Sequence, residues 1–466
     1  WGEIKGLTDV LLLAYQDDDR TQEAAVNTIT GVGSANGRLP VTPIGLGFQE
    51  GDGLGLDIKI GERLGWDNGA CSGNWGAHAQ IDSIVNEALE AGAFPGCRVL
   101  VAHQGRVMHD GVYGTTDGTV KVEESTIYDL ASITKIAATT LCLMAEEEAN
   151  MFDVDEPILK KLTTLDTTDI GTRTYREILS HQAGLYPWIP FYLETLSDSL
   201  NLLSSRPLCD KNICITPELY ICEEFIDTIY KRIISSELKP SGEYRYSDLG
   251  YYLIHKMLNN TYGTDNAIDS LSAAKFYNPM GLFSMGYNPL NISGINMNEI
   301  APTEVDTIFR KGTIQGYVHD SGAALFGGVC GHAGVFSDAH DLARLGQMLL
   351  NGGSSLGINF FDLKENTIKN WTQRAFPNGD NRRGIGFDKP ALEYDHGPTC
   401  NLASKSSFGH SGFTGTLLWV DPQYELVYVF LSNRTYPDSE NTKLITMDVR
   451  TEIQRVIMEQ LNTSLR

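Results

Sequence analysis

The sequence has little positive charge and no long apolar run, and these two absences exclude large classes of protein. No apolar run reaches the roughly 18 residues that a membrane-spanning helix needs. Only 36 Lys and Arg residues stand against 59 Asp and Glu residues, so the formal net charge is -23 at pH 7. No Lys/Arg cluster offsets this balance. We therefore expect neither a membrane span nor a nucleic-acid partner.

Cysteine is sparse as well, with 8 residues among 466. No two cysteines have the C-x-x-C spacing that is typical of zinc sites. Cys209, Cys214 and Cys222 lie together in a segment (205–223) that has the character of an insertion. A local disulfide and free thiols both remain open there, because an oxidising compartment is itself an inference.

The stretch Ser132-Ile133-Thr134-Lys135 is the most informative part of the chain. A strand-like run (125–130) precedes it and a helical pattern (136–148) follows. We expect the serine at a helix N-terminus, where unpaired N–H groups favour a developing negative charge. The lysine lies one turn later on the same helix face, and a buried lysine that loses its proton could act as base for the hydroxyl. Taken alone, the tetrapeptide is equally compatible with a plain helix start and a surface lysine.

Tyr246-Ser247-Asp248 marks a second polar turn, between an aromatic-rich extended run and a helix. A tyrosine on such a turn can hold its phenolic oxygen near a nucleophile, and a neighbouring lysine would lower its pKa. A Ser/Asp helix cap preceded by core tyrosines is the alternative interpretation.

His410-Ser411-Gly412 comes directly before a β-hairpin pattern, with apolar runs at 417–420 and 426–431. Glycine at 412 allows close backbone approach, so an edge strand could line a cleft and donate an N–H group to an oxyanion. A glycine-rich strand entry with a structural histidine is the alternative.

In this order, the three motifs resemble those of the serine β-lactamase/penicillin-binding-protein superfamily, in its class C β-lactamase, D-aminopeptidase and esterase branch. The resemblance runs from about residue 80 to the C-terminus. It includes Leu-Ser-His-Gln-Ala-Gly-Leu at 179–185 and Gly-His-Ala-Gly-Val-Phe-Ser at 331–337.

The resemblance implies that Ser132 forms an acyl-enzyme and that Lys135 and Tyr246 share the proton transfer. The backbone N–H groups of Ser132 and Phe413 would bind the oxyanion. The substrate-binding residues that we expect in the cleft are Ser247, Asp248, His410, Ser411, Gly412, His181, Trp188, His319 and Asp320. No cofactor and no metal are implied.

Two positions depart from the family pattern: Ser247 stands where β-lactamases usually have Asn, and His410 where they have Lys. The cleft would then lack the permanent cation that binds a β-lactam carboxylate, because a histidine with a pKa near ~6.5 is mostly neutral at pH 7. Arg245, Arg382 and Arg383 could hold a carboxylate, but exposed arginines usually hold nothing. The departures weaken a β-lactamase activity and leave a serine hydrolase.

Other polar residues near these motifs have two interpretations. His181 is expected to support the cleft rather than to catalyse. Trp188 could stack a substrate or pack in a surface loop. His319, Asp320 and His332 could face the cleft, but they form no helical H-x-x-x-H pattern, so we expect no metal.

The periodicity predicts an α/β (α+β) fold. A helix (77–93), a hairpin (97–113), a C-terminal hairpin and a last helix (444–461) would form one antiparallel sheet covered by terminal helices. A mostly helical lobe (133–401) would pack beside it, with the cleft between. Residues 1–60 resemble the tail of a glycoside hydrolase family 3 C-terminal domain. Residues 61–76 would be a linker, and 77–466 the hydrolase domain.

The leading hypothesis is an acyl-serine hydrolase that cleaves an amide in peptidoglycan-derived muramoyl-peptides. A family 3 tail next to a β-lactamase-like domain resembles the fused hexosaminidase–N-acetylmuramoyl-L-alanine amidase proteins. A promiscuous carboxylesterase, a D-aminopeptidase, a β-lactamase and an inactive peptidoglycan-fragment binding module remain alternatives. The partner would be a small molecule or muropeptide, and the compartment extracytoplasmic. The start at Trp1, without Met or a signal-peptide pattern, is expected for an interior or processed N-terminus.

Overall fold

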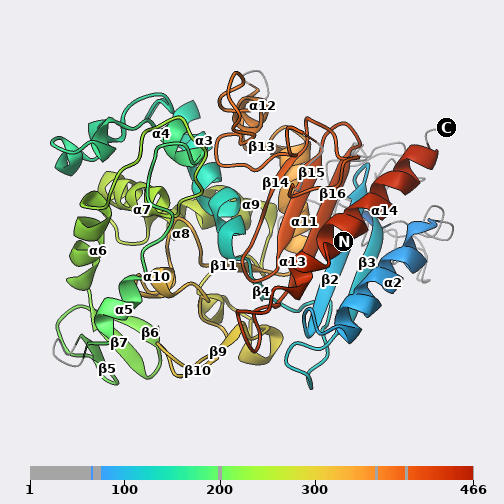
Figure 1. Cartoon of the computed structure of the whole chain (residues 1–466), viewed down its shortest axis with the longest axis horizontal. Coiled ribbons are helices and arrows are strands. Elements are labelled where there is room, and N and C mark those ends of the chain that lie inside the picture. The colour runs from blue at the N-terminus through green and yellow to red at the C-terminus, as the bar shows by residue number, and fades with distance from the viewer. Residues whose placement is uncertain (1–64, 67–74, 198–201, 363–365, 394–396, 465–466) are drawn as a thin grey trace, which may run out of the picture.

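The computed structural model describes residues 65–66, 75–197, 202–362, 366–393 and 397–464. The predicted glycosidase-like tail (1–60) and most of the predicted linker lie outside these residues. Figure 1 shows the described chain as two lobes, a sheet with its covering helices on the right and a mostly helical lobe on the left.

One lobe is built on a six-stranded sheet with the order β1-β3-β2-β16-β15-β14. The strands are β1 (Gly65–Trp66), β2 (Gly96–His103), β3 (Arg106–Gly114), β14 (Phe408–Ser411), β15 (Leu417–Asp421) and β16 (Leu426–Ser432). β1 joins β3 in parallel, and the other pairs are antiparallel. Because β2 pairs with β16, strands from the two ends of the domain lie side by side, and this confirms the predicted sheet.

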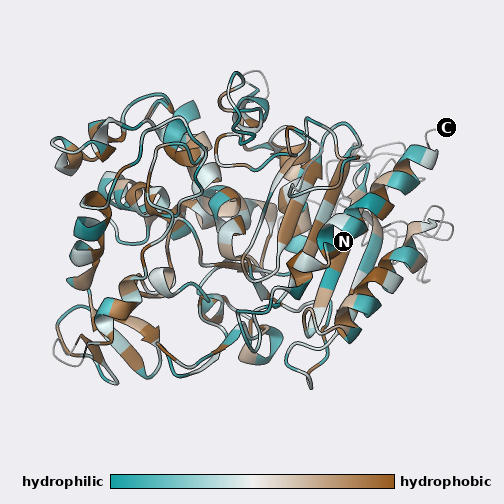
Figure 2. Cartoon of the chain, viewed as in Figure 1, coloured by the Kyte–Doolittle hydropathy of each residue, from teal (hydrophilic) through white to brown (hydrophobic). Residues whose placement is uncertain are grey.

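The central strands are apolar on both faces because helices cover both faces. On β16, Leu426, Tyr428 and Phe430 pack in the core beneath α2 (Ala77–Glu90) and α14 (Val449–Ser464). Val427 and Val429 face the opposite core, which α11 (Ala339–Leu350) covers. Figure 2 shows these strands as predominantly hydrophobic and the outer sides of α2 and α14 as largely hydrophilic.

The second lobe is mostly helical, as predicted, and also carries small sheets. Its helices are α3 (Thr140–Glu148), α4 (Tyr175–Leu179), α5 (Phe191–Thr195), α6 (Phe225–Ile234), α7 (Leu249–Tyr262), α8 (Ala267–Ser272), α9 (Asn278–Met280), α10 (Ser321–Ala324) and α12 (Thr367–Thr372). The short helix α13 (Lys443–Thr446) lies with the sheet lobe, beside α14. The short strands are β4 (Tyr128–Asp129), β5 (Leu203–Ser204), β6 (Asn212–Thr216), β7 (Leu219–Cys222), β8 (Gly286–Tyr287), β9 (Glu304–Asp306), β10 (Gly312–Ile314), β11 (Val335–Ser337), β12 (Ser354–Ser355) and β13 (Ile358–Asn359). No helix in the described ranges is long and apolar enough to cross a membrane.

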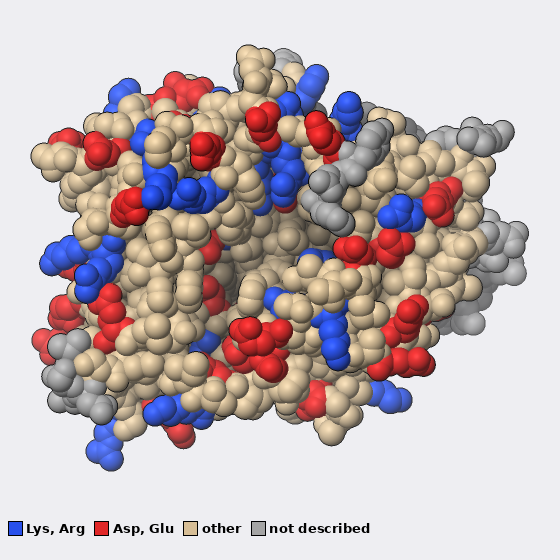
Figure 3. Space-filling view, in the orientation of Figure 1, with Lys and Arg blue, Asp and Glu red and all other residues tan. Residues whose placement is uncertain are grey.

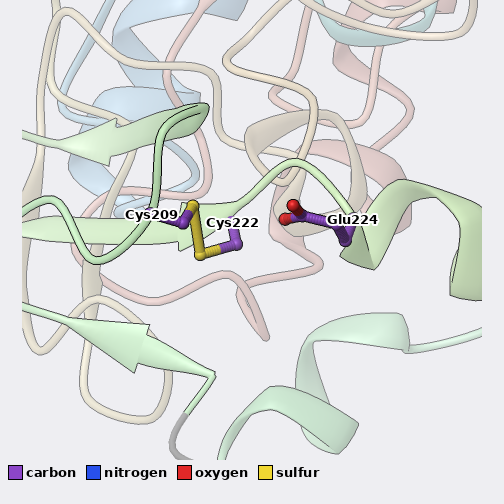
Figure 4. Close-up of side chains that lie close together, drawn as sticks. All are labelled: Cys209, Cys222 and Glu224. Carbon is purple, nitrogen blue, oxygen red and sulfur yellow. A yellow bond between two sulfur atoms is a disulfide. The ribbon is translucent and has the colours of Figure 1, made fainter.

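The cysteine-rich insertion folds into the small β5-β7-β6 sheet. Cys209 and Cys222 form a disulfide, and Cys214 is a free, exposed thiol. Figure 4 shows Glu224 beside the two bonded sulfur atoms. Sulfur atoms in a disulfide are not thiolate ligands, so this group does not offer the metal-binding set that its residue types suggest.

Candidate active site

Ser132 follows β4, the strand that Figure 1 shows near the junction of the two lobes, in the turn that leads to a helix. Ala131–Ile133 forms a 3₁₀ turn and Lys135–Thr139 a π-helical turn, before α3 begins. The predicted helix at 136–148 therefore exists but starts irregularly. Ala131 has φ of 46°, a left-handed value that costs a non-glycine residue about 1–3 kcal/mol. Figure 3 shows a hollow between the lobes, near the middle of this face.

Two side chains meet at the hydroxyl of Ser132, one from three residues later in the sequence and one from 114 residues later. Its hydroxyl oxygen accepts hydrogen bonds from Nζ of Lys135 and from the phenolic oxygen of Tyr246, both at 2.9 Å. Lys135 is completely buried, and its Nζ also donates to the carbonyl oxygen of His332 at 3.1 Å. The sequence-predicted trio is thus assembled around one hydroxyl group.

The protonation of this trio differs from the prediction. Burial alone would lower the pKa of Lys135, but the Asp248 carboxylate, 2.7 Å from Nζ, and the oxygen of Tyr246 outweigh burial and raise the pKa. Burial raises the pKa of Tyr246, although Lys135 and Arg383 act to lower it. At neutral pH the resting site therefore holds an ammonium group and a neutral phenol, and not the free amine and acidified phenol that we expected.

Ser247 and Asp248 do not take the substrate-binding places that the sequence predicted for them. Ser247 is buried, its hydroxyl donates to the carbonyl oxygen of Tyr186 at 2.6 Å, and it accepts from the N–H of Leu249. Ser247 therefore holds the turn together and does not face the cleft as a substrate-binding residue. Asp248, also predicted to bind substrate, is instead the ion partner of Lys135.

The third motif lies directly against the serine turn. A Cβ at Gly412 would overlap the carbonyl oxygen of Leu130, so only glycine permits this approach. The hydroxyl groups of Thr414 and Thr416 donate to the carbonyl oxygens of Asp129, at 2.7 Å, and Leu130, at 3.0 Å. These contacts bring the backbone around Phe413 beside that of Ser132, where the predicted oxyanion site would form.

Two buried histidines flank the phenol ring and are neutral. The ring of His181 lies 4.3 Å and that of His410 6.1 Å from the ring of Tyr246, measured between centroids. Burial, followed by the charges of Arg383 and Lys135, lowers the pKa of His410 to about 3 and that of His181 well below its usual value. His181 accepts a hydrogen bond from the N–H of Ser247 at 3.2 Å, so it supports the tyrosine turn as predicted.

The comparisons with known proteins agree with this geometry. Residues 81–449 match the Beta-lactamase family. The chain belongs to this family. It is therefore a serine hydrolase with the β-lactamase fold.

Proteins similar to this chain cover most of its length. A Bacillus subtilis (strain 168) protein named N-acetylmuramyl-L-alanine amidase is 30% identical over 390 residues, which are 77% of this chain and 81% of that protein. An Escherichia coli O157:H7 protein named "Putative D-alanyl-D-alanine carboxypeptidase" is 28% identical over 382 residues, covering 77% and 82%. The class C β-lactamase of Rhodobacter sphaeroides superposes with a TM-score of 0.54 at 16% identity, over 83% of this chain and 99% of that one, which shows the shared fold alone.

Arg383 is a site residue that the sequence reasoning misjudged. We grouped it with exposed arginines, but its side chain is buried and its guanidinium carbon lies 5.3 Å from the centroid of the Tyr246 ring. The site of this Beta-lactamase family member thus contains a buried permanent cation beside Tyr246, which the sequence reasoning did not place there. A loop arginine gives no periodic signal of burial, so only its place next to Gly-Ile-Gly-Phe at 384–387 could have drawn attention to it.

His319 and Asp320, which were also predicted to bind substrate, contact residues that surround Ser132. Nε2 of His319 lies 2.8 Å from the Glu304 carboxylate, and the His319 ring stacks on the exposed ring of Phe413. Asp320 caps α10 and lies 2.9 Å from His332, whose carbonyl oxygen binds Lys135. We therefore describe both as supports of the cleft.

Trp188 lies beside the tyrosine turn. The carbonyl oxygen of the preceding Pro187 accepts the N–H of Asp248 at 3.1 Å, and the Trp188 side chain is 46% exposed. An exposed indole close to Asp248, the ion partner of Lys135, is compatible with the prediction that Trp188 stacks on a substrate. The stacking stays a prediction. Ser411 lies at the end of β14, and its carbonyl oxygen accepts a hydrogen bond from Nδ1 of His410 at 2.7 Å.

Proposed function

We propose that the chain is an acyl-serine amidase that cleaves the bond between the lactyl group of muramic acid and L-alanine in muramoyl-peptides. The observation that carries the proposal is the contact of both Lys135 and Tyr246 with the hydroxyl of Ser132. The named activity of the Bacillus subtilis relative supports the choice of substrate.

In the proposed reaction, the reactive form has a Tyr246 phenolate beside the Lys135 ammonium group. The phenolate takes the proton of Ser132 as Oγ attacks the amide carbonyl carbon. The backbone N–H groups of Ser132 and Phe413 stabilise the oxyanion. Tyr246 then passes its proton to the leaving amine, and the peptide departs from a muramoyl ester on Ser132. Water, deprotonated by Tyr246, hydrolyses that ester and restores the hydroxyl.

The substrate preference follows from the charges in the cleft. His410 is neutral, with its pKa lowered to about 3 by burial and by Arg383 and Lys135. Arg383 is itself buried near the Asp388 carboxylate. Neither residue offers a solvent-facing cation for a β-lactam carboxylate, so a substrate bound through hydrogen bonds and sugar or peptide contacts fits better.

The test is parallel incubation of the protein with a muramoyl-dipeptide, a p-nitrophenyl ester and nitrocefin, with products identified by mass. We expect two products from the muramoyl-dipeptide, the free peptide and muramic acid with its lactyl carboxylate. We also expect measurable ester hydrolysis and poor nitrocefin turnover. The variant Ser132→Ala is the control and should release nothing. Efficient nitrocefin turnover without peptide release would contradict the proposed substrate.

A second substrate is the terminal D-alanyl-D-alanine amide, which the name of the Escherichia coli relative suggests. The same acyl-serine chemistry would serve it. Adding a pentapeptide substrate to the assay separates the two, because loss of one D-alanine and loss of the whole peptide differ in mass.

The proposed compartment is extracytoplasmic. The Cys209–Cys222 disulfide supports it, because disulfides persist mainly in oxidising compartments. Alkylation of the protein as isolated from cells should modify Cys214 and spare Cys209 and Cys222.

A further inference from the structure

A short segment outside the three motifs crosses from one lobe to the other behind Tyr246. At its start, the side chain of Asn381 donates to the carbonyl oxygen of Ser180 and to the side chain of Gln182, both at 2.9 Å. At its end, Asp388 exchanges two backbone hydrogen bonds, of 2.8 and 3.1 Å, with Gly409 of β14. Both ends of the segment 381–388 are therefore fixed. The residues between them are held in a defined position.

This segment carries the buried guanidinium group of Arg383. Only 3% of the residue is exposed, and Cζ lies 5.3 Å from the ring centroid of Tyr246 and 5.8 Å from that of Tyr244. Nε and Nη1 have no hydrogen-bond acceptor among the residues that the structure describes. Asp388 lies 3.4 Å from Nε, but its two oxygens accept from Arg382, at 2.8 and 3.0 Å. The charge of Arg383 is therefore only partly compensated, and it lies next to the face of a catalytic phenol.

Two cations lie near the ring of Tyr246, Lys135 and Arg383. The charged and titratable groups in the surroundings of Tyr246 include its direct neighbours and the groups in contact with these neighbours. They are Lys135, Asp248, Tyr244, Tyr251, His181, His410, Arg383 and Asp388. The two histidines are neutral because burial lowers their pKa values. Among these groups only Lys135 and Arg383 carry positive charge, and they lie at similar distances, 5.1 and 5.3 Å, from the ring centroid of Tyr246.

We infer that Arg383 is a positioning residue for catalysis, whose fixed charge stabilises the phenolate of Tyr246 while that phenolate takes the proton of Ser132. The inference rests on the proposed function because it requires this proton transfer. It does not depend on which substrate is cleaved. In the transfer, the O–H bond of Ser132 breaks and the O–H bond of Tyr246 forms, so the negative charge moves from the tyrosine to the reacting oxygen. Arginine suits this place because its charge persists at every pH at which the enzyme works.

The test is the pH profile of kcat/KM for p-nitrophenyl acetate in the variants Arg383→Met and Arg383→Lys. A cation at this range favours a neighbouring anion by about one to two pKa units, so Arg383→Met should move the midpoint of the acidic limb upward by that amount. At pH 7 kcat/KM should fall about 10- to 100-fold, chiefly through kcat, and recover at high pH. Arg383→Lys should keep the midpoint close to that of the unchanged protein.

Arg382→Met is the matched control. Arg382 also binds Asp388 and lies over the ring of Tyr244, with Cζ 5.5 Å from that centroid, but no contact with the Tyr246 ring is found for it in the described part of the chain. It should leave the midpoint unchanged. If Arg383→Met does not fold, Arg383→Gln, which keeps hydrogen-bonding capacity without the charge, should show the same upward shift.

A uniform loss at all pH values, with an unmoved midpoint and a lower Tm, would overturn the inference and leave Arg383 a structural residue. Failure of the proposed function has a different signature. In that case Ser132→Ala would keep its ester hydrolysis, whatever the profile of the Arg383 variants.

Discussion

The hydroxyl of Ser132 becomes a nucleophile only when a neighbouring group can take its proton. In the resting site both neighbours donate to it, because the pKa values of Lys135 and Tyr246 are raised. Removing one proton from this pair gives the reactive form, with the negative charge on the phenol and the positive charge on the lysine. The site therefore acts as one unit of three residues.

Removal of one member should disable this unit almost as thoroughly as removal of two. We expect Ser132→Ala to lose about 10⁴- to 10⁶-fold in kcat and Lys135→Ala to lose nearly as much, as is usual for interdependent catalytic groups. The double variant should then be little worse than Ser132→Ala alone. Steady-state kinetics with a p-nitrophenyl ester measures all three. Losses that multiply in the double variant would mean that the two residues act independently.

The pH dependence of the reaction should have an alkaline midpoint. Activity requires a deprotonated Tyr246, whose pKa is raised first by burial and further by the Asp248 carboxylate, so kcat/KM should rise with pH through the neutral range and into the alkaline range. Asp248→Asn removes that negative charge and should lower the pKa of both Tyr246 and Lys135. The midpoint should then move down by about one pH unit, opposite to the shift expected for Arg383→Met. A midpoint that does not move, or moves up, would contradict this assignment of the charges.

At the scale of elements, the close approach of β14 to the serine turn determines whether an oxyanion site can form. A Cβ at Gly412 would overlap the Leu130 carbonyl oxygen and the Thr416 hydroxyl, so the strand must move away. We expect Gly412→Ala to cost about 10²- to 10³-fold in kcat, the usual loss for one oxyanion donor. Gly312→Ala in β10, where a Cβ meets nothing within 4 Å, is the matched control and should be neutral. Equal activity of the two variants would place the oxyanion donors elsewhere.

The regular elements of this domain could be predicted from the sequence because their apolar patterns are long. Strands such as β16 are apolar on both faces, and α2 has a clear apolar side, so periodicity identifies both. The irregular start of the helix after Ser132 could not be predicted, since a 3₁₀ turn and a π-turn depend on tertiary contacts such as the 2.8 Å bond from the N–H of Ala131 to the Asp129 side chain.

The candidate site was predictable as far as its motifs extend. The trio of Ser132, Lys135 and Tyr246 was identified because order and spacing carry the signal. That Asp248 binds the lysine and Ser247 holds the turn could not be predicted, because both contacts depend on the geometry of the turn. Arg383 was missed because burial of a loop arginine is decided by what packs around it, about 140 residues away in sequence.

At the scale of the whole molecule, the first 60 residues should not contribute to the chemistry. They carry none of the three motifs that form the site around Ser132. Deletion of residues 1–60 stops before β1, which pairs with β3, and before α2. We expect ester hydrolysis within a few-fold of the full chain, with solubility or stability as the only loss. Hexosaminidase activity in the full chain, or loss of ester hydrolysis in a folded deletion variant, would contradict this.

The central claim is that Ser132 is the residue that becomes acylated, and covalent labelling tests it most directly. The protein is treated with a fluorophosphonate, its intact mass is measured, and the modified residue is located by peptide mapping. The account predicts one adduct per chain, on Ser132, and no adduct in Ser132→Ala. An adduct on another serine, or undiminished labelling of Ser132→Ala, would contradict it.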